Sequence, residues 1–343
     1  MKAAVVTRER TLVRPIRSAR QTHSGRTDVA LVLRSGDAYG VGVASPHPHP
    51  VMGDPGVPEV LDSLRSVGLS RLCAVGRTDQ GRMWAHATSL FSDLPRDRWT
   101  SAIVESAILD LESVEANRSW SELLGGGATS FQSVGSLVGD SHEVRINPLA
   151  ARYRIKVSHS SLDHFEELSV LDAPVVLDFN GDAPEIEVVR SSVGEARRYA
   201  TVVGVEQAWA IGDFDRPAAL REAGIRVFHD ESMRSVSDLR HAIRYEAVDE
   251  CAIKPARCGG IAVSREIARR ARAAGVEIYV GGFFESSLGR FRNHLLAMSL
   301  QAGPSDVLDV LTGQPVTAQV AEQDKRSLVE LAQQQGEWIE VGG

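Results

Sequence analysis

The stretch Val-Val-Leu-Asp-Phe-Asn (175–180) is a short apolar run that ends in a charged side chain. The same arrangement recurs on both sides of it, in Arg-Ile-Lys (154–156), Val-Val-Gly-Val-Glu-Gln (202–207), Ile-Arg-Val-Phe-His-Asp-Glu-Ser (225–232), Glu-Cys-Ala-Ile-Lys-Pro (250–255) and Ile-Tyr-Val-Gly-Gly-Phe-Phe-Glu-Ser (278–286). The gaps between successive charged residues are 22, 28, 24, 24 and 31 residues, counted along Lys156, Asp178, Glu206, Asp230, Lys254 and Glu285. Each gap fits one strand and one helix. A charge at the C-terminal end of each strand is typical of a β/α barrel.

The sequence before this stretch predicts a different kind of domain. Val29–Leu33 and Tyr39–Val43 are β-prone and are joined by a Ser-Gly-Asp turn at 35–37. From Pro58 to about Leu124 the apolar spacing becomes helical, and three glycines at 125–127 end this region. Strand and helix then alternate, which predicts parallel strands with right-handed crossovers. The expected helices are Asp163–Val170, Glu185–Ala200, Arg216–Gly224, Val236–Glu246, Ser264–Ala274, Arg290–Leu300 and Lys325–Gln335, with a last strand at Glu337–Val341.

Composition excludes several classes of protein. The 343 residues are 43% hydrophobic, enough for a sizeable core, and the net charge of −7 argues against a nucleic-acid-binding protein. Three cysteines, Cys73, Cys251 and Cys258, form no Cys-x-x-Cys pair, so we expect reduced thiols in a cytoplasmic protein. The chain has no apolar stretch of about 18 residues, so no membrane span is expected. No Gly-x-Gly-x-x-Gly follows a first strand, which argues against a dinucleotide-binding sheet.

Two polar stretches in the N-terminal part are predicted to be loops. Residues 16–28 are polar throughout and are expected to form a mobile loop. Residues 45–57 contain His47 and His49, each followed by a proline. Two histidines two residues apart can indicate a metal site, but the flanking prolines favour a rigid extended loop.

The charged residues at the strand ends suggest a specific chemistry. Three carboxylates, Asp178, Glu206 and Asp230, would converge and repel one another unless a divalent cation lay among them. An all-oxygen set prefers a hard ion, Mg²⁺ first and Mn²⁺ second. Lys156 and Lys254 would then face each other across the barrel mouth. This layout suits removal of a proton next to a carboxylate, with the metal stabilising the enediolate.

Arg154 lies two residues before Lys156 and points to the same side of the strand. Its fixed positive charge is expected to lower the pKa of Lys156 toward neutrality, as a catalytic base requires. Taken singly, an Asp or Glu at a strand end is more often a helix cap or a surface charge, and a single Lys before Pro means little. The interpretation rests on six of them in register with strand ends.

These segments together resemble the enolase superfamily, in its muconate-cycloisomerase-like subgroup. Arg-Ile-Lys (154–156) resembles the family's Lys-x-Lys motif, and Asp-Phe-Asn (178–180), Glu-Gln (206–207) and Asp-Glu-Ser (230–232) resemble its three metal-ligand motifs. Residues 253–260 resemble the sixth-strand lysine segment. Residues 281–293 resemble the seventh-strand segment of the o-succinylbenzoate synthases and N-acylamino acid racemases.

The resemblance implies an α/β fold with an α+β capping domain (1–127), a modified (β/α)₇β TIM-like barrel (128–312) and a C-terminal segment (313–343) that packs back toward the capping domain. It implies Mg²⁺ held by the three carboxylates, Lys156 as the first base and Lys254 as the acid, base or electrostatic group opposite. The supporting residues would be Arg154, Asn180, Glu231 and Glu285. Backbone N–H groups at Ser286 and Ser287 could bind a substrate carboxylate at a helix N-terminus.

The activity implied first is o-succinylbenzoate synthase-like loss of water from a cyclohexadiene carboxylate, as in the menaquinone pathway. An N-acylamino acid racemase or a muconate-type cycloisomerase is the alternative within the class. A dipeptide epimerase ranks lower, because Ser305-Asp306-Val307 offers one acid where those enzymes carry two. Arg154 replaces a lysine and Val43 replaces an acid of the family pattern, which keeps a non-catalytic ligand-binding barrel open as another class. The expected partner is a small carboxylate, and a homo-oligomer is compatible with the pattern.

Overall fold

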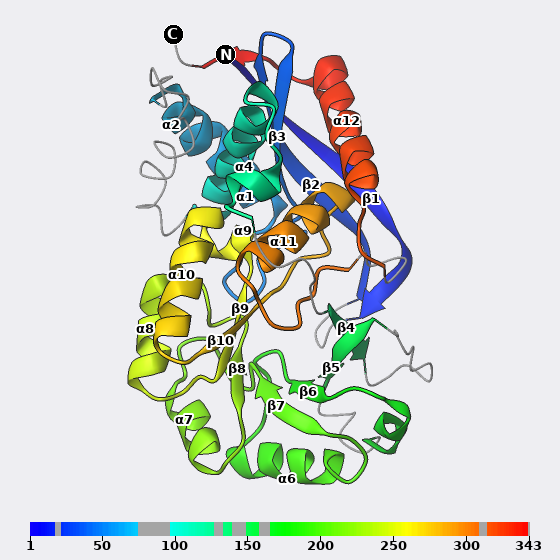
Figure 1. Cartoon of the computed structure of the whole chain (residues 1–343), viewed down its shortest axis with the longest axis vertical. Coiled ribbons are helices and arrows are strands. Elements are labelled where there is room, and N and C mark those ends of the chain that lie inside the picture. The colour runs from blue at the N-terminus through cyan, green and yellow to red at the C-terminus, as the bar shows by residue number, and fades with distance from the viewer. Residues whose placement is uncertain are drawn as a thin grey trace.

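The computed structural model describes residues 1–17, 22–74, 97–126, 133–138, 149–157, 165–308 and 314–341. These residues build two β-sheets, shown in Figure 1. The first is antiparallel and has the strand order β11 (Ile339–Glu340), β1 (Lys2–Arg17), β2 (Thr22–Ser35) and β3 (Ala38–Ala44). The chain therefore returns at its C-terminal end to pair with its first strand.

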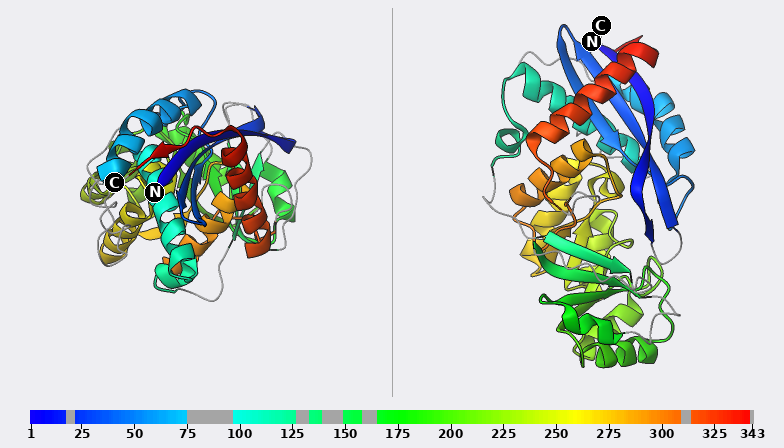
Figure 2. Two further views of the ribbon diagram at one scale, coloured as in Figure 1. Left: turned by 90° about the horizontal axis from the view of Figure 1, so that it is seen from above. Right: turned by 90° about the vertical axis from the view of Figure 1, so that its right-hand side faces the viewer.

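The antiparallel sheet is buried on both faces because β2 alternates between two apolar clusters. Val29, Leu31 and Leu33 face α4 (Arg98–Glu115), whereas Ala30 and Val32 face α12 (Ala318–Gln335). Figure 2 shows α12 lying across this sheet. The α4 side also carries α1 (Val57–Ser63), a π-helical turn (Leu64–Gly68) and α2 (Leu69–Ala74), and α5 (Trp120–Leu123) follows α4.

Two glycines allow α4 to approach β3 closely. A Cβ atom at Gly42 would lie 1.8 Å from the carbonyl oxygen of Ile103, and one at Gly40 would lie 2.3 Å from that of Ala107. No side chain fits at either position without moving the helix. The Gly-Val-Gly pattern of residues 40–42 therefore has a packing reason.

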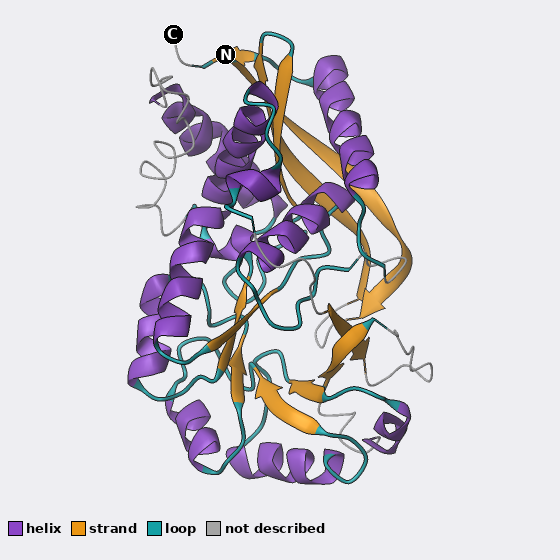
Figure 3. Ribbon diagram, in the orientation of Figure 1, coloured by secondary structure: helices purple, strands orange, loops and turns teal. Residues whose placement is uncertain are grey.

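The second sheet is parallel and curled. Its strand order is β10 (Glu277–Val280), β9 (Glu250–Ile253), β8 (Val227–His229), β7 (Val202–Glu206), β6 (Val175–Asp178), β5 (Ala150–Lys156) and β4 (Ser133–Val138). Helices connect the strands on the outer side, as Figure 3 shows. They are the 3₁₀ turn Phe165–Val170, α6 (Ile186–Ala196), α7 (Asp215–Glu222), α8 (Val236–Arg244), α9 (Pro255–Cys258), α10 (Ile261–Ala273) and α11 (Ser287–Ser299).

The segment after α11 continues the sheet beyond β10. The N–H of Gly303 donates to the Ile278 carbonyl at 2.8 Å, and the N–H of Asp306 donates to that of Val280 at 2.8 Å. From β5, the Arg152 side chain reaches the Pro304 carbonyl at 3.3 Å across the interior. Side chains thus join the first part of the curled sheet to the last.

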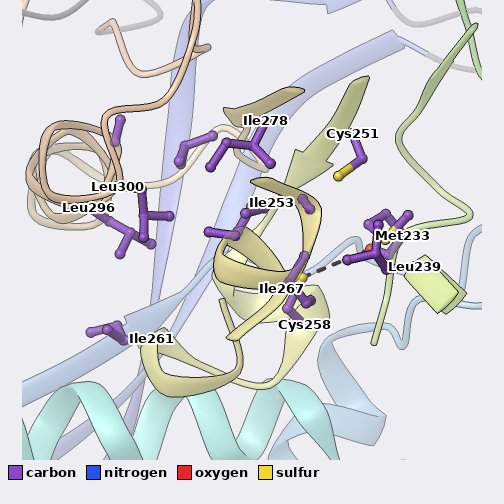
Figure 4. Close-up of a cluster of buried hydrophobic side chains, with 14 of the residues drawn as sticks. Met233, Leu239, Cys251, Ile253, Cys258, Ile261, Ile267, Ile278, Leu296 and Leu300 are labelled. Carbon is purple, nitrogen blue, oxygen red and sulfur yellow. Dashed lines mark hydrogen bonds between the residues drawn. The ribbon is translucent and has the colours of Figure 1, made fainter. Parts of the chain in front are cut away.

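Apolar clusters hold the helices against the parallel sheet. One cluster joins β9 and β10 to α8, α10 and α11 through residues such as Ile253, Ile267 and Leu296, drawn in Figure 4. Another joins β5 to β8 with the 3₁₀ turn, α6 and α7. Cys251 and Cys258 are buried free thiols, as expected from their number and spacing.

The predicted α/β fold class is confirmed, and the 3₁₀ turn is the short second helix that the sequence predicted. The prediction of a mobile loop at 16–28 is wrong in part. β1 extends to Arg17 and β2 begins at Thr22, because the two strands pair as a long hairpin on both sides of a register shift between Thr11 and Ile16. The predicted domain boundaries, near residues 127 and 312, lie outside the described residues and stay predictions.

Three helices begin at least three residues earlier than predicted, α10 at Ile261, α11 at Ser287 and α12 at Ala318. Glycine and serine near their starts hid the first turns of α10 and α11 from a prediction based on apolar spacing. Within the described ranges, no helix has the length and apolarity needed to cross a membrane.

Candidate active site

The parallel strands bring the predicted charged residues together by register. Lys156 on β5 pairs with Asp178 on β6, and Asp178 pairs with Glu206 on β7. Asp230 follows the last residue of β8 directly, and Lys254 follows the last residue of β9. Because parallel strands present their C-terminal ends at one edge, the five side chains form one row across the sheet.

Each carboxylate in the row has a cationic partner. The Lys156 ammonium donates to Asp178. Arg154 Nε donates to Glu206 Oε2 at 2.9 Å, and Lys254 Nζ donates to Asp230 Oδ2 at 2.7 Å. The lysines therefore lie at the two ends of the carboxylate row, as the sequence predicted.

Burial and crowding set the charge of these carboxylates. Glu206 is fully buried between Asp178 and Asp230, and desolvation together with those two charges raises its pKa to about 7 although Arg154 opposes this. Asp230 behaves in the opposite way. Burial alone would raise its pKa, but Lys254, Arg257 and Arg154 together hold it well below the usual range.

The pKa expectation for Lys156 is corrected by the structure. Desolvation, the largest influence, lowers its pKa, and Arg154 lowers it as expected. Asp178, Glu206 and the hydrogen bond to Asp178 outweigh both, so the net pKa of Lys156 is raised. Asp178 on the next strand influences Lys156 more strongly than Arg154 does on the same strand.

Asn180 contacts the carboxylate row through Asp178, and Glu231 contacts Asn180. The Asn180 backbone N–H donates to Asp178 Oδ1 at 2.9 Å, and its side-chain amide contacts Glu231 Oε1 at 3.4 Å. Asn180 has a φ of 47°, so its backbone is held in a conformation that only the surrounding contacts maintain. Burial and the charge of Asp230 raise the pKa of Glu231 to about 7.

Gln207 is a supporting residue to which the sequence analysis gave no role. Its side-chain oxygen accepts from the N–H groups of Asp230 (3.1 Å) and Ser232 (2.9 Å). Its amide donates to the Trp209 carbonyl at 2.8 Å. It thereby fixes the backbone that carries Asp230. The Nε2 atom of His229 contacts the Ala247 carbonyl at 2.9 Å, away from the row.

Glu285 has the predicted supporting contacts. Its Oε1 accepts from the Phe283 N–H at 2.7 Å and from Asn293 at 3.2 Å, and Arg290 lies 3.3 Å from its Oε2. Glu285 therefore shapes the turn after β10.

Ser286 and Ser287 lie at the start of α11, where a substrate carboxylate was predicted to bind. Ser286 is the N-cap residue and is buried. One N–H of this first turn, that of Leu288, already donates to Asp324 of α12 at 2.9 Å. The predicted role of the two serines stays a prediction.

Two charged residues near the row were missed as functional candidates. Arg257 on α9 donates to Asp230 Oδ1 at 2.6 Å and to Asp54 at 2.7 Å, and both partners are buried. Asp54 belongs to the 45–57 loop, so Arg257 joins that loop to the carboxylate row. The only sequence signal was the arginine within the quoted segment 253–260.

The 45–57 loop is held by its own hydrogen bonds, but it folds back on itself around a turn at Val51–Asp54 and is not extended as predicted. His47 pairs with Gly56 through a β-bridge, and its ring packs on Phe283 with a centroid distance of 5.9 Å. His49 is exposed. The two histidines therefore point to different surroundings, which agrees with a structural loop.

As the side chains lie here, no group of three or more His, Cys, Asp or Glu in the described ranges is placed to hold a metal ion. A cation already lies against each carboxylate. The donor set nevertheless fits Mg²⁺, because Asp178, Glu206 and Asp230 offer only oxygen on adjacent strands. Glu206 Oε1 is buried without a hydrogen-bond partner among the described residues, and burial together with the charges of Asp178 and Asp230 raises the pKa of Glu206.

Comparison with known proteins gives consistent matches. Residues 166–318 match the family model described as "Enolase C-terminal domain-like". N-succinyl-L-Arg/Lys racemase of Bacillus cereus is 33% identical over 96 residues, 28% of this chain and 26% of that protein. The o-succinylbenzoate synthase of Enterococcus faecalis is 33% identical over 90 residues, 26% of this chain and 24% of that protein. The chain thus matches only about a quarter of the length of these curated relatives.

A solved structure matches over much more of the chain. It is the 2-chloromuconate cycloisomerase of Rhodococcus opacus, with a TM-score of 0.77 and 19% identity. The match covers 90% of this chain and 87% of that one. At this identity the likeness shows a shared fold of both sheets.

Proposed function

We propose that this chain is a member of the enolase superfamily, whose C-terminal domain-like model matches residues 166–318, and that it is an enzyme that removes the proton from the carbon next to a substrate carboxylate. The observation that carries the proposal is the position of Lys156 and Lys254 at the two ends of the row formed by Asp178, Glu206 and Asp230. A bound α-carbon between the lysines would have a proton-transfer group on each side.

The residues in and around the row have different proposed roles. Asp178, Glu206 and Asp230 would hold Mg²⁺, which when bound supplies positive charge beside the substrate carboxylate. Lys156 takes the proton. Burial and Arg154 act to lower its pKa, whereas Asp178 and Glu206 outweigh them and keep it raised. Arg257 and Gln207 hold Asp230 in place. Asn180 does the same for Asp178.

Within this class we propose o-succinylbenzoate synthase-like dehydration. Lys156 takes the α-proton, the hydroxyl group on the neighbouring carbon leaves, and the protonated lysine can return the proton so that water departs. Lys254 is held against Asp230, and its Nζ lies 4.9 Å from the Phe283 ring centroid. This fixed ammonium can stabilise negative charge on the substrate without exchanging a proton.

Racemisation of N-acylamino acids is the second candidate. It needs two lysines that reach one carbon from opposite sides, and both lysines are in place here. Epimerisation of dipeptides is less well supported. Asp306, the acid available near the end of the sheet, lies 3.4 Å from Arg290 and 3.6 Å from Arg154 and is committed to them.

The experiment is a pair of assays on the purified protein with Mg²⁺. Dehydration is followed by the loss of absorbance of the cyclohexadiene substrate. Racemisation is followed by proton NMR in D₂O, as loss of the α-proton signal of N-succinyl and N-acetyl amino acids. Turnover of the diene with slow exchange supports the synthase, and fast exchange with no dehydration supports the racemase.

A non-catalytic barrel predicts a different outcome, namely that neither substrate reacts. Calorimetric titration with Mg²⁺ then separates an enzyme with an untested substrate from a binding protein. An enzyme of this kind should bind the ion at millimolar concentration or below. Absence of binding there would overturn the proposed chemistry.

A further inference from the structure

Arg26 on β2 is a buried cation that forms no ion pair with another of the described residues. Its side chain is 3% exposed. The other buried arginines in the described ranges each lie within 4 Å of an acidic side chain, namely Arg152, Arg154, Arg257, Arg290 and Arg292. Among the described residues, Nε and Nη2 of Arg26 have no hydrogen-bond partner. A buried guanidinium in this state is costly unless an anion completes it.

The groups around Arg26 leave two of its nitrogen atoms uncommitted. Nη1 lies 3.2 Å from His47 Nδ1 and 3.5 Å from the Pro46 carbonyl. The guanidinium carbon lies 5.2 Å from the Phe284 ring centroid. Loop and ring therefore hold the guanidinium in position, and neither neutralises its charge.

The carboxylates near Arg26 have other partners. Asp28 accepts from Arg10 at 2.7 Å, from Arg8 at 2.8 Å and from Ser45 at 2.6 Å. Glu285 Oε1 accepts from the turn after β10, and its Oε2 lies 3.3 Å from Arg290 with no hydrogen-bond partner among the described residues. Burial lowers the pKa of Arg26 to about 10; Glu285 and Asp28 oppose this shift, and Arg10 and Arg290 add to it.

Arg26 and Lys254 of the candidate active site contact two consecutive phenylalanine residues, Phe284 and Phe283. The Phe283 ring contacts His47 on one side, and Lys254 Nζ lies 4.9 Å from its centroid. Phe284, the next residue, packs on Arg26. A ligand that reaches Lys254 with one end could therefore meet Arg26 with the other.

We propose that Arg26 is a specificity-determining residue that binds a second carboxylate of the substrate through its free Nε and Nη2 atoms. These two nitrogens present parallel N–H groups that match the two oxygens of a carboxylate. The inference rests on the proposed function and narrows it to acids with a second, distal carboxylate.

The test compares two ligands by calorimetry with Mg²⁺ present. The first ligand, N-succinyl-L-phenylalanine, carries the distal carboxylate. The second is the same molecule with the succinyl carboxylate replaced by a primary amide, which has the same shape without the charge. The wild-type protein should bind the acid about 10- to 100-fold more tightly, the range for a charge-assisted bidentate contact. Arg26→Met should remove this preference, and Arg26→Lys should keep part of it.

A matched control is available on the same strand. Arg34 is exposed and donates to the Gly36 carbonyl, so Arg34→Met should keep the full preference. If Arg26→Met also keeps it, or if the wild-type protein shows none, the proposal is wrong. Titration with inorganic phosphate tests whether Arg26 binds a free anion. Phosphate that binds the wild-type protein as tightly as the dicarboxylate, and fails to bind Arg26→Met, would assign Arg26 to a free anion instead of the substrate.

Thermal unfolding separates a binding role from a structural one. Since the charge of Arg26 has no acidic partner within the part of the chain that the structure describes, Arg26→Met should leave Tm unchanged or raise it. A lower Tm with equal loss of both ligands would make Arg26 a structural residue and overturn the proposal. Binding needs no turnover, so an inactive protein that still discriminates the two ligands would disprove only the proposed reaction.

Discussion

Asp110 offers the strongest test of how the parts of the chain are joined. It is buried on α4 and lies 2.8 Å from Arg292 of α11 and 2.9 Å from Lys325 of α12. It also accepts from the Val41 N–H at 2.8 Å and from the Trp120 indole at 3.1 Å. One carboxylate thus holds together the antiparallel sheet, a helix of the parallel sheet and the C-terminal helix.

Asp110→Asn should be strongly destabilising. The amide keeps an oxygen for the backbone N–H but leaves Arg292 and Lys325, both largely buried, without their counter-charge. Removing one partner of a buried ion pair costs about 3–5 kcal/mol. Urea unfolding at neutral pH, followed by circular dichroism and tryptophan fluorescence, measures this difference in the free energy of unfolding.

Two further variants control the interpretation. Lys325→Met added to Asp110→Asn removes one of the stranded charges and should recover about 1–3 kcal/mol. Glu322→Gln breaks the exposed pair with Arg326, whose atoms lie 3.5 Å apart, and should change stability by no more than about 0.5 kcal/mol. A cost below about 1 kcal/mol for Asp110→Asn would refute the view that this carboxylate joins the three parts.

The difference in the free energy of unfolding between wild type and Asp110→Asn should change with pH in a direction set by the pKa of Asp110. Burial alone would raise the pKa of Asp110, but Arg292, Lys325 and the hydrogen bonds outweigh it, so the folded pKa is lowered. Its stabilising contribution is therefore complete above the unfolded pKa of about 3.9. It is lost as pH falls through the lower folded value. The stability gap between wild type and Asp110→Asn should be constant from neutral pH to about pH 5 and shrink below about pH 4. A gap that widens with acid would contradict the assignment.

Three other predictions concern the site. Lys156→Met should lower kcat by about 10²- to 10⁴-fold with Mg²⁺ binding retained in calorimetry, and Lys254→Met should do so equally in a racemase but less in a synthase. Asp54→Asn should raise KM about tenfold and speed proteolysis at 47–53, since losing a charge-assisted contact to Arg257 costs about 1.5–3 kcal/mol of loop attachment. Removal of metal with EDTA should abolish turnover, and added Mg²⁺ or Mn²⁺ should restore it; activity that survives EDTA would disprove the metal assignment.

The row of charged residues was predictable because parallel strands impose their own order. Lys156, Asp178 and Glu206 end three consecutive strands, so register alone aligns them. Their pattern could be recognised without knowing any long-range contact. The same holds for the antiparallel hairpin at residues 29–43, where alternation and a Ser-Gly-Asp turn are local signals.

Contacts between the two sheets were not predictable in this way. Arg257 and Asp54 are 203 residues apart, and the sequence around either residue does not identify the other as its partner. Arg26 looked like part of a polar loop, yet it is buried on β2. Its burial depends on the 45–57 loop and on Phe284 of the other sheet, which a local reading of residues 16–28 cannot include.

Asp54 and Arg26, which the sequence did not reveal as site residues, both lie where the antiparallel part of the chain meets the parallel sheet. Their position separates the contributions of the two parts to the site. The carboxylate row and the lysines come from the parallel sheet alone, so the proposed proton removal depends on residues of that sheet. Asp54 and Arg26 come from the antiparallel part and meet the row through Arg257 and through the Phe283–Phe284 pair. A change at either residue can therefore alter which acid is bound without altering how a proton is removed. Substrate preference in this chain should follow the residues at this junction, while the rate of proton transfer follows the row.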